Sequence, residues 1–162
     1  MSFWAIIKNL KLDQIWLLFI WFLKYPLFMS STIIATYYTM KIVQKEFFDV
    51  HNKHNKANAF RHALWNLLIA NQCYKLSSNL DSILNWTKKI TDWHEKFSPN
   101  KEMAKLMDLH NNEIGRNRFL EWKEFITDEI VKQLKSELST AVLVKNKVEI
   151  NNSENKLIYL EN

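Results

Sequence analysis

Glycine, proline and cysteine are nearly missing from this sequence. Its 162 residues include one glycine, two prolines and one cysteine. Because glycine and proline form turns and end helices, their scarcity predicts long helices joined by few connections. The single Cys73 excludes an internal disulfide and a zinc site made of several cysteines. A lone thiol also suits a reducing compartment, so we expect a cytoplasmic protein, with peripheral attachment to the inner membrane as the alternative.

The sequence also has no strong excess of positive or negative charge. The chain has 22 Lys and Arg against 17 Asp and Glu, a net charge of +5. The lysines alternate with acidic residues, as they do from Lys132 to Glu137, whereas a nucleic-acid surface gathers them on one face. We therefore do not expect nucleic acid as a partner. Hydrophobic residues make up 48% of the chain, which is ample for one compact domain.

The chain opens with an apolar, aromatic stretch. Residues 15–23 are all apolar, and a second apolar run occupies residues 27–40. The first run is too short to span a membrane, which takes about 20 residues. Trp, Phe and Tyr beside lysines favour a membrane interface. We expect residues 1–40 to be buried in the domain or to contact a membrane surface or a membrane-associated protein; a true anchor and a cleaved signal are the alternatives.

Helical patterns follow as far as residue 141. Ser30, Ser31 and Thr32 suggest the N-terminal cap of a helix, and Asn79 or Ser78 suggests another. The expected helices cover residues 30–48, 57–76, 80–97, about 100 to 119, and 127 to about 141. Between the first two lies a polar link with His51 and His54, which we interpret as a solvated connector.

The last 21 residues change pattern. β-Branched and alternating residues flank a turn-forming cluster at residues 151–155, which predicts a small C-terminal β-hairpin. The predicted fold is therefore all-α, a bundle of about five to six helices with a small hairpin. We expect N-terminal helices over residues 1–45, a helical motif domain over 46–141 and the hairpin over 142–162, packed as one unit.

Unusual polar residues gather in the middle of the chain. In the stretch 58–66, Asn58, Arg61, His62, Trp65 and Asn66 follow the i, i+3, i+4 spacing of one helix face. The other positions of this helix are apolar too, which predicts that the whole helix is buried. Buried polar groups are costly unless they are paired. This face is thus either the wall of a site or a closed hydrogen-bond network.

Two further stretches add to this set. His94 and Glu95 are neighbours, so their side chains diverge by about 100°. We expect His94 to face inward and Glu95 to lie at the margin. The third stretch carries a polar stripe and the only glycine of the chain: Asp108, Asn111, Asn112, Gly115 and Arg116. A glycine inside a helix suggests the close approach of another helix or a ligand, or the end of the helix.

These residue types fit two kinds of chemistry. In the first, His62 is a general base oriented by Asp108, and Arg61 stabilises an oxyanion with His94 in support. In the second, His62, His94 and Asp108 bind a divalent metal ion that activates water. The remaining polar set would bind substrate or complete a network: Asn58, Trp65, Asn66, Asn111, Asn112, Gly115 and Arg116.

Three motifs of this chain resemble those of a bacterial domain family of unknown function. They are Asn-Ala-Phe-Arg-His-Ala-Leu-Trp-Asn at 58–66, His-Glu at 94–95 and Met-Asp-Leu-His-Asn-Asn-Glu-Ile-Gly-Arg at 107–116. The family occurs as stand-alone proteins of Bacteroidetes-type bacteria and as terminal domains of toxin-like proteins. The resemblance implies a helical domain with a shared polar site, without implying an activity.

A second resemblance concerns Arg61 and His62 alone. This pair is similar to the run that carries the catalytic base of bacterial phospholipase A2, although Ala63 stands where that family has Asp. Together with the aromatic N-terminus, it suggests a small hydrolase that acts on a lipid or membrane-associated substrate. The alternative is a non-enzymatic structural or interaction module, with a buried polar network and an N-terminus that docks on a membrane or partner.

Overall fold

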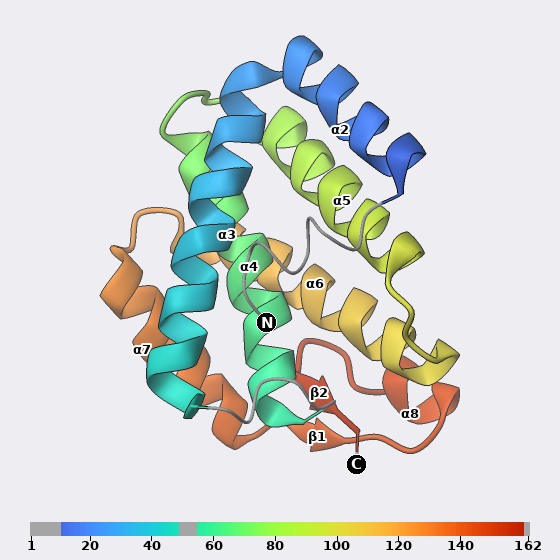
Figure 1. Ribbon diagram of the computed structural model, residues 1–162. Coiled ribbons are helices and arrows are strands. Elements are labelled where there is room, and N and C mark those ends of the chain that lie inside the picture. Colours follow the sequence, from blue (N-terminus) through green and yellow to red (C-terminus); the bar gives the residue numbers. More distant parts are fainter. Residues whose placement is uncertain (1–10, 49–54, 161–162) are drawn as a thin grey trace.

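The computed structural model describes residues 11–48 and 55–160 (Figure 1). The part that it describes contains seven helices and two short strands. Six helices form the bundle: α2 (Leu12–Lys24), α3 (Pro26–Phe47), α4 (Lys56–Tyr74), α5 (Leu80–Phe97), α6 (Glu102–Trp122) and α7 (Thr127–Ser139). The predicted all-α bundle with small C-terminal strands is confirmed. The predicted link with His51 and His54 lies outside the described residues.

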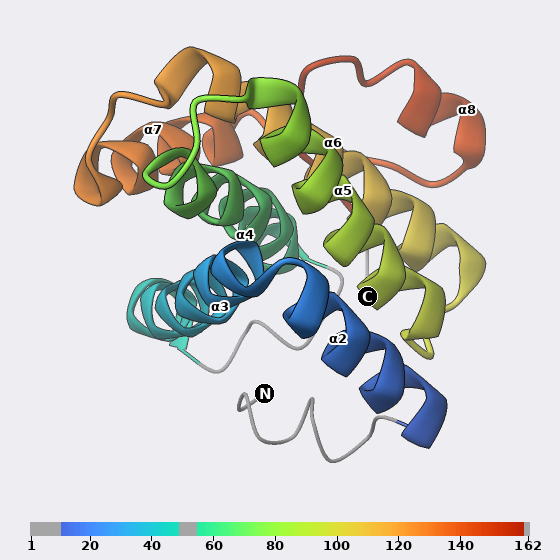
Figure 2. The same ribbon diagram turned by 90° about the horizontal axis from the view of Figure 1, so that it is seen from above.

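Helix α4 lies at the centre of the bundle (Figures 1 and 2), where it contacts α3, α5, α6 and α7. Of its 19 residues, 14 are buried. A helix surrounded on all sides must be apolar on all sides, which explains its many Ala and Leu residues. Its N-terminus is capped by the Asn55 side chain, which accepts a hydrogen bond from the amide of Asn58. The polar residues of α4 are therefore held inside the protein.

The first two described helices meet at a proline. Helix α3 begins at Pro26, and not at the predicted cap around Ser30. Proline suits the first turn of a helix, where its missing N–H costs nothing. Ser30 and Thr32 lie inside α3 because their hydroxyls donate to the carbonyls of Pro26 and Phe28, each four residues earlier. No helix in residues 11–48 or 55–160 is long and apolar enough to cross a membrane.

The C-terminal strands pair in parallel and do not form the predicted hairpin. Strand β1 (Val142–Leu143) pairs with β2 (Ile158–Tyr159) in the same direction. Helix α8 (Lys147–Asn151) stands between them, capped by Asn146, whose side chain accepts from the Glu149 amide. With this cap, a segment of strand-like composition forms a helix. The chain crosses back through α8, so β2 starts at the same end of the sheet as β1.

Helices α4 and α6 touch through their backbones at Gly115. A Cβ atom built at Gly115 would lie 2.2 Å from the carbonyl oxygen of Ala63. Such a distance is far below van der Waals contact, and a backbone oxygen in the middle of a buried helix cannot move aside. The close approach of a helix is one of the roles predicted for this glycine.

We expect Gly115→Ala to destabilise the protein, although alanine favours a helix by about 1 kcal/mol over glycine. The added methyl group must separate α4 from α6, and overpacking of this kind costs about 1–3 kcal/mol. Urea unfolding followed by circular dichroism measures the change. Asn117→Ala, at an exposed position on α6, serves as the control and should change stability by less than about 0.5 kcal/mol. An alanine variant as stable as the wild type would contradict the close contact.

Candidate functional site

The site lies where α4, α5 and α6 meet, around the ring of His62. Its Nδ1 atom is 3.3 Å from Glu95 Oε1 on α5, and its Nε2 atom is 3.3 Å from Asp108 Oδ1 on α6. The three side chains are 3%, 0% and 1% exposed, respectively. A buried imidazole thus stands between two buried carboxylates, and these three residues are called the His62 cluster below.

Arg61 adds a second positive group to the edge of the His62 cluster. Its Nη2 atom lies 3.3 Å from His62 Nε2, and its guanidinium also donates to Asn58 Oδ1. The amide of Asn58 in turn donates to Asp108 Oδ1 at 2.8 Å, and Asn100 donates to Asp108 Oδ2 at 2.8 Å. With His62 protonated, two cations balance two anions, which lowers the cost of burying them.

The charges in the cluster shift its pKa values. Burial by itself lowers the pKa of His62, but the charge of Asp108 and the hydrogen bond to Glu95 outweigh burial and raise it above 6.5. Burial raises the pKa of Asp108. Burial also acts to raise the pKa of Glu95, but the hydrogen bond and charge of His62 prevail and lower it. At neutral pH, Glu95 is therefore ionised, and His62 keeps its proton to a higher pH than a free imidazole does.

Asn66 and Asn112 tie the cluster to its surroundings. Asn66 Nδ2 donates to the His62 carbonyl and to Asn112 Oδ1, while its Oδ1 accepts from Thr91 and Arg116. Asn66 therefore uses its full hydrogen-bonding capacity. Asn112 also lies 3.1 Å from His62 Nδ1 and donates to Glu95 Oε1 at 3.3 Å. These amides fix the position of the imidazole.

One acceptor beside His62 has no donor among the described residues. Glu95 Oε2 is buried and makes no hydrogen bond with residues 11–48 or 55–160. Buried carboxylate oxygens without a donor are rare because the lost hydration costs free energy. The atom is therefore a place where a bound molecule with an O–H or N–H group would be stabilised.

In the second motif, the residue that faces the His62 cluster is Glu95 and not the predicted His94. His94 does not join the cluster: it is only partly buried, and its ring packs against Trp65 with a centroid distance of 5.2 Å. Glu95, predicted at the margin, is fully buried beside His62. The pattern that could have revealed Glu95 is the i, i+4 series of buried residues that leads to it along α5: Ile83, Thr87, Thr91 and Glu95.

The other predicted residues divide into two groups. Asn58, Arg61, Asn66, Asn112 and Arg116 join the network around His62 and Asp108, as described above. Three others lie apart from it and serve the packing of neighbouring elements. Trp65 donates to Thr36 on α3, Asn111 exchanges two hydrogen bonds with the backbone of Ile158, and Gly115 meets α4.

A divalent ion has a possible ligand set here, with Glu95 in place of the predicted His94. Ligand atoms of His62, Glu95 and Asp108 all lie within 4.8 Å of one another. The two carboxylates, however, face different nitrogens of the ring: Glu95 faces Nδ1 and Asp108 faces Nε2. A single ion can bind only one of these two nitrogens. The Arg61 guanidinium also lies 3.3 Å from Nε2 and repels a cation. Protons on both ring nitrogens satisfy both carboxylates, so this geometry suits an imidazolium better than a metal ion.

The fold and the site together define a helical bundle with a buried histidine–carboxylate cluster. A family model described as a domain of unknown function, DUF6973, matches residues 19–142. Because the match covers well over half of the chain, the protein belongs to this family. No curated protein and no solved structure matches the chain. The matched region contains all the residues of the His62 cluster and its network.

The pKa shifts predict how stability depends on pH. Because the pKa of His62 is raised on folding, its contribution is fully present below about pH 6.5 and is lost as the pH rises through the folded value. The raised pKa of Asp108 acts in the same direction. We expect the free energy of unfolding, measured in urea, to be lower at pH 9 than at pH 6.

His62→Gln should reduce the loss of unfolding free energy between pH 6 and pH 9. His110→Gln, which removes a histidine outside the cluster, should leave this loss as in the wild type. An unchanged decline in His62→Gln would show that other groups cause the pH dependence.

Proposed function

We propose that the protein is a small hydrolase of a lipid or membrane-associated substrate, with His62 as its general base. The observation that carries this proposal is that Nε2 of His62 has a partner in either protonation state. Asp108 Oδ1 at 3.3 Å suits the protonated ring, and the Arg61 guanidinium at 3.3 Å suits the neutral ring. Perturbed titratable groups held in this way are typical of catalytic sites.

The geometry supports a simple acid–base sequence. In the neutral ring, Glu95 and Asn112 hold the proton on Nδ1, and the lone pair of Nε2 faces Arg61. A water molecule that takes the place of the guanidinium at Nε2 would give its proton to this lone pair. The water oxygen then bonds to the carbonyl carbon of an ester, and Arg61 stabilises the resulting oxyanion. When the ester C–O bond breaks, the proton on Nε2 passes to the leaving oxygen, and Asp108 stabilises the imidazolium in between.

Substrate must reach Nε2 past partly buried side chains. Arg61, Trp65 and His94 are partly exposed, whereas His62 is 3% exposed. Nε2 faces Arg61, so this part of the cover lies on the side where the lone pair is needed. Displacement of these side chains by substrate would open the site. His94 then serves as part of the cover and takes no part in proton transfer.

A second candidate is a structural or interaction module in which the cluster only joins helices. The burial of His62 favours this candidate. Two hollows in the described surface lie elsewhere, against the C-terminal segment, and are lined by residues such as His110 and Glu113 or Val142 and Leu143. A buried polar network can specify a fold without catalysis.

We also propose that the three motifs at 58–66, 94–95 and 107–116 mark a site shared across the family, that the family is bacterial, and that the protein works at the cytoplasmic side of a membrane. The support for the shared site is that the first and third motifs, and Glu95 of the second, meet around His62.

The hydrolase proposal predicts a loss of turnover in His62→Gln. The probes are vesicles of phosphatidylglycerol and phosphatidylethanolamine, with released fatty acid or headgroup measured by mass spectrometry, and a soluble p-nitrophenyl ester. Removal of the general base should lower turnover by about 10²–10⁴-fold. In the wild type, the rate should rise with pH through a pKa above 6.5, because only the neutral ring acts as a base.

His110→Gln is the matched control, since it alters a partly exposed histidine on α6, outside the His62 cluster. Circular dichroism confirms that both variants are folded. Full turnover in a folded His62→Gln protein, or no product from the wild type with any probe, would favour the structural module instead.

A further inference from the structure

The outer side of helix α2 is apolar. Its exposed large hydrophobic residues recur at the i, i+3, i+4, i+7 spacing of a single stripe: Leu12, Ile15, Trp16, Phe19, Phe22 and Leu23. The opposite side of the helix packs inward through Trp21, whose ring lies 6.2 Å from that of Trp86 on α5. A helix on the surface of a soluble protein ordinarily turns charged residues outward. Helix α2 is therefore apolar on both sides.

Helix α3 continues the same stripe. Its exposed large hydrophobic residues also follow helical spacing and are Leu27, Ile33, Ile34, Tyr37 and Tyr38. Tyr25 lies between the two helices and is 45% exposed. These twelve residues, six on α2, one at the corner and five on α3, are called the α2–α3 face. They are 12 of the 18 exposed large hydrophobic residues in the described part of the chain.

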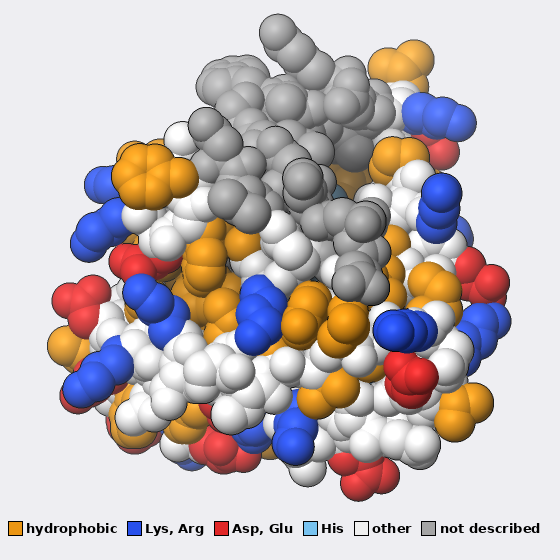
Figure 3. Space-filling view, turned by 90° about the horizontal axis from the view of Figure 1, so that it is seen from below, with side chains coloured by type: hydrophobic (Ala, Val, Ile, Leu, Met, Phe, Trp, Pro, Cys, Tyr) orange, Lys and Arg blue, Asp and Glu red, His pale blue; other side chains and the backbone are white. Residues whose placement is uncertain are grey.

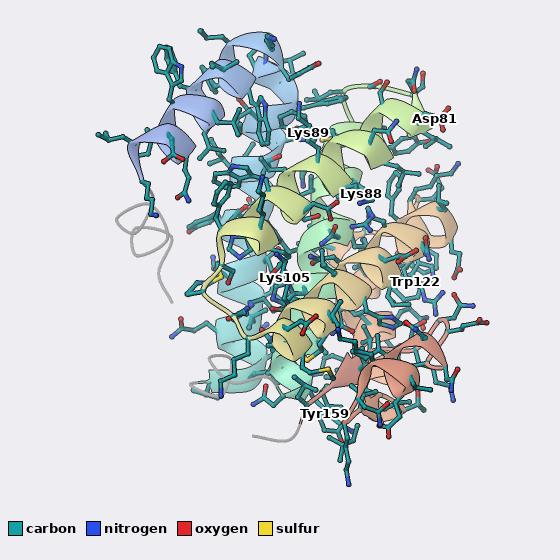
Figure 4. The ribbon with its side chains drawn as sticks, turned by 90° about the vertical axis from the view of Figure 1, so that its right-hand side faces the viewer. Asp81, Lys88, Lys89, Lys105, Trp122 and Tyr159 are labelled. Atoms are coloured by element: carbon teal, nitrogen blue, oxygen red, sulfur yellow. The ribbon has the colours of Figure 1, made fainter. Side chains whose placement is uncertain are left out.

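The other outer surfaces are polar or mixed. The outer side of α5 carries Asp81, Lys88 and Lys89, which are all exposed (Figure 4). On the face seen in Figure 3, basic and acidic side chains are scattered among hydrophobic ones. The apolar surface is therefore a local property of α2 and α3, and patches of this kind mark interaction sites.

Lysines border the α2–α3 face. Lys11 precedes α2, Lys24 ends it, and Lys41 and Lys45 lie in the last two turns of α3; all four are exposed. The one exposed acidic residue in residues 11–48 is Asp13. Glu46 is half-buried and forms an ion pair with Lys135 of α7. The border is thus positively charged, and it complements an anionic surface.

A further lysine joins the border from α5. The Nζ atom of Lys89 lies 4.5 Å from the ring centroid of Trp21 and 5.3 Å from that of Tyr25 (Figure 4). This contact places a cation beside the corner between α2 and α3.

We propose that the α2–α3 face is a membrane-binding surface for anionic lipid bilayers. Its Trp, Tyr and Phe rings are the residue types that settle between headgroups and acyl chains, and its lysines are placed to contact anionic headgroups. Because neither α2 nor α3 can span a membrane, both lie along the interface. The proposal is independent of catalysis, because it concerns a surface apart from the His62 cluster.

Vesicle flotation of the full-length protein tests the proposal. Vesicles of phosphatidylcholine are compared with vesicles that contain 30% phosphatidylglycerol. The wild type should bind the anionic vesicles at least tenfold more tightly, and 0.5 M NaCl should weaken that binding, because salt screens the lysines. The double variant Trp16→Glu/Leu23→Glu should lose at least tenfold in affinity, because it places charges in the apolar stripe. Lys24→Glu should weaken binding to anionic vesicles about fivefold.

Val148→Glu is the matched control, since it places the same charge at an apolar residue that is 67% exposed on α8; it should bind like the wild type. Circular dichroism verifies that each variant is folded. Equal binding to both vesicle types, or a double variant that binds like the wild type, would overturn the proposal. A wild type that ignores vesicles would also overturn it, and a dimer abolished by Trp16→Glu/Leu23→Glu in analytical ultracentrifugation would then assign the face to a second copy of the chain.

Discussion

The imidazole of His62, held between two carboxylates, joins three helices in the buried interior of this bundle. Each charge buried there would cost several kcal/mol alone. The cost is reduced because Arg61 and His62 balance Glu95 and Asp108, and because the amides of Asn58, Asn66, Asn100 and Asn112 supply hydrogen bonds. The central position of α4 follows from this arrangement, since its polar residues must meet partners on both α5 and α6. Loss of the His62 proton leaves two buried carboxylates with one cation, so the charge balance that stabilises the fold also favours the protonated ring, which connects the fold to the proposed chemistry.

Much of the fold could be predicted from local patterns. Helix α5 begins and ends where the Asn79 cap and the Ser98-Pro99 pair indicate, because caps and proline act within one turn. The polar stripe on α4 and the burial of Asp108 and Asn112 followed from helical spacing between apolar neighbours. The partner of the single glycine could not be predicted, because one sequence does not reveal which helix passes beside it.

Three features depended on tertiary contacts. Adjacent His94 and Glu95 point in different directions, and the choice between them rests on how α5 is rotated against α4 and α6. Residue type suggested His94, whereas the rotation set by Ile83 and Thr87 buries Glu95. The C-terminal strands are parallel because the connection between them crosses back through α8, and both α8 and β2 contact α6. The outward apolar stripe of α2 has the same sequence periodicity as a core-facing stripe, so only the position of the helix shows which side is exposed.

The contact at Gly115 has a consequence for the site itself. Asp108 lies two turns earlier on α6 than Gly115, and His62 is the neighbour of Ala63, whose carbonyl the glycine touches. The 3.3 Å between His62 Nε2 and Asp108 Oδ1 is therefore set by how closely the two backbones meet. A position without a side chain therefore sets the spacing between the ring and the carboxylate. Any larger residue at 115 would lengthen that spacing without touching either group, so the pKa of His62 depends in part on a Cβ atom that the glycine lacks.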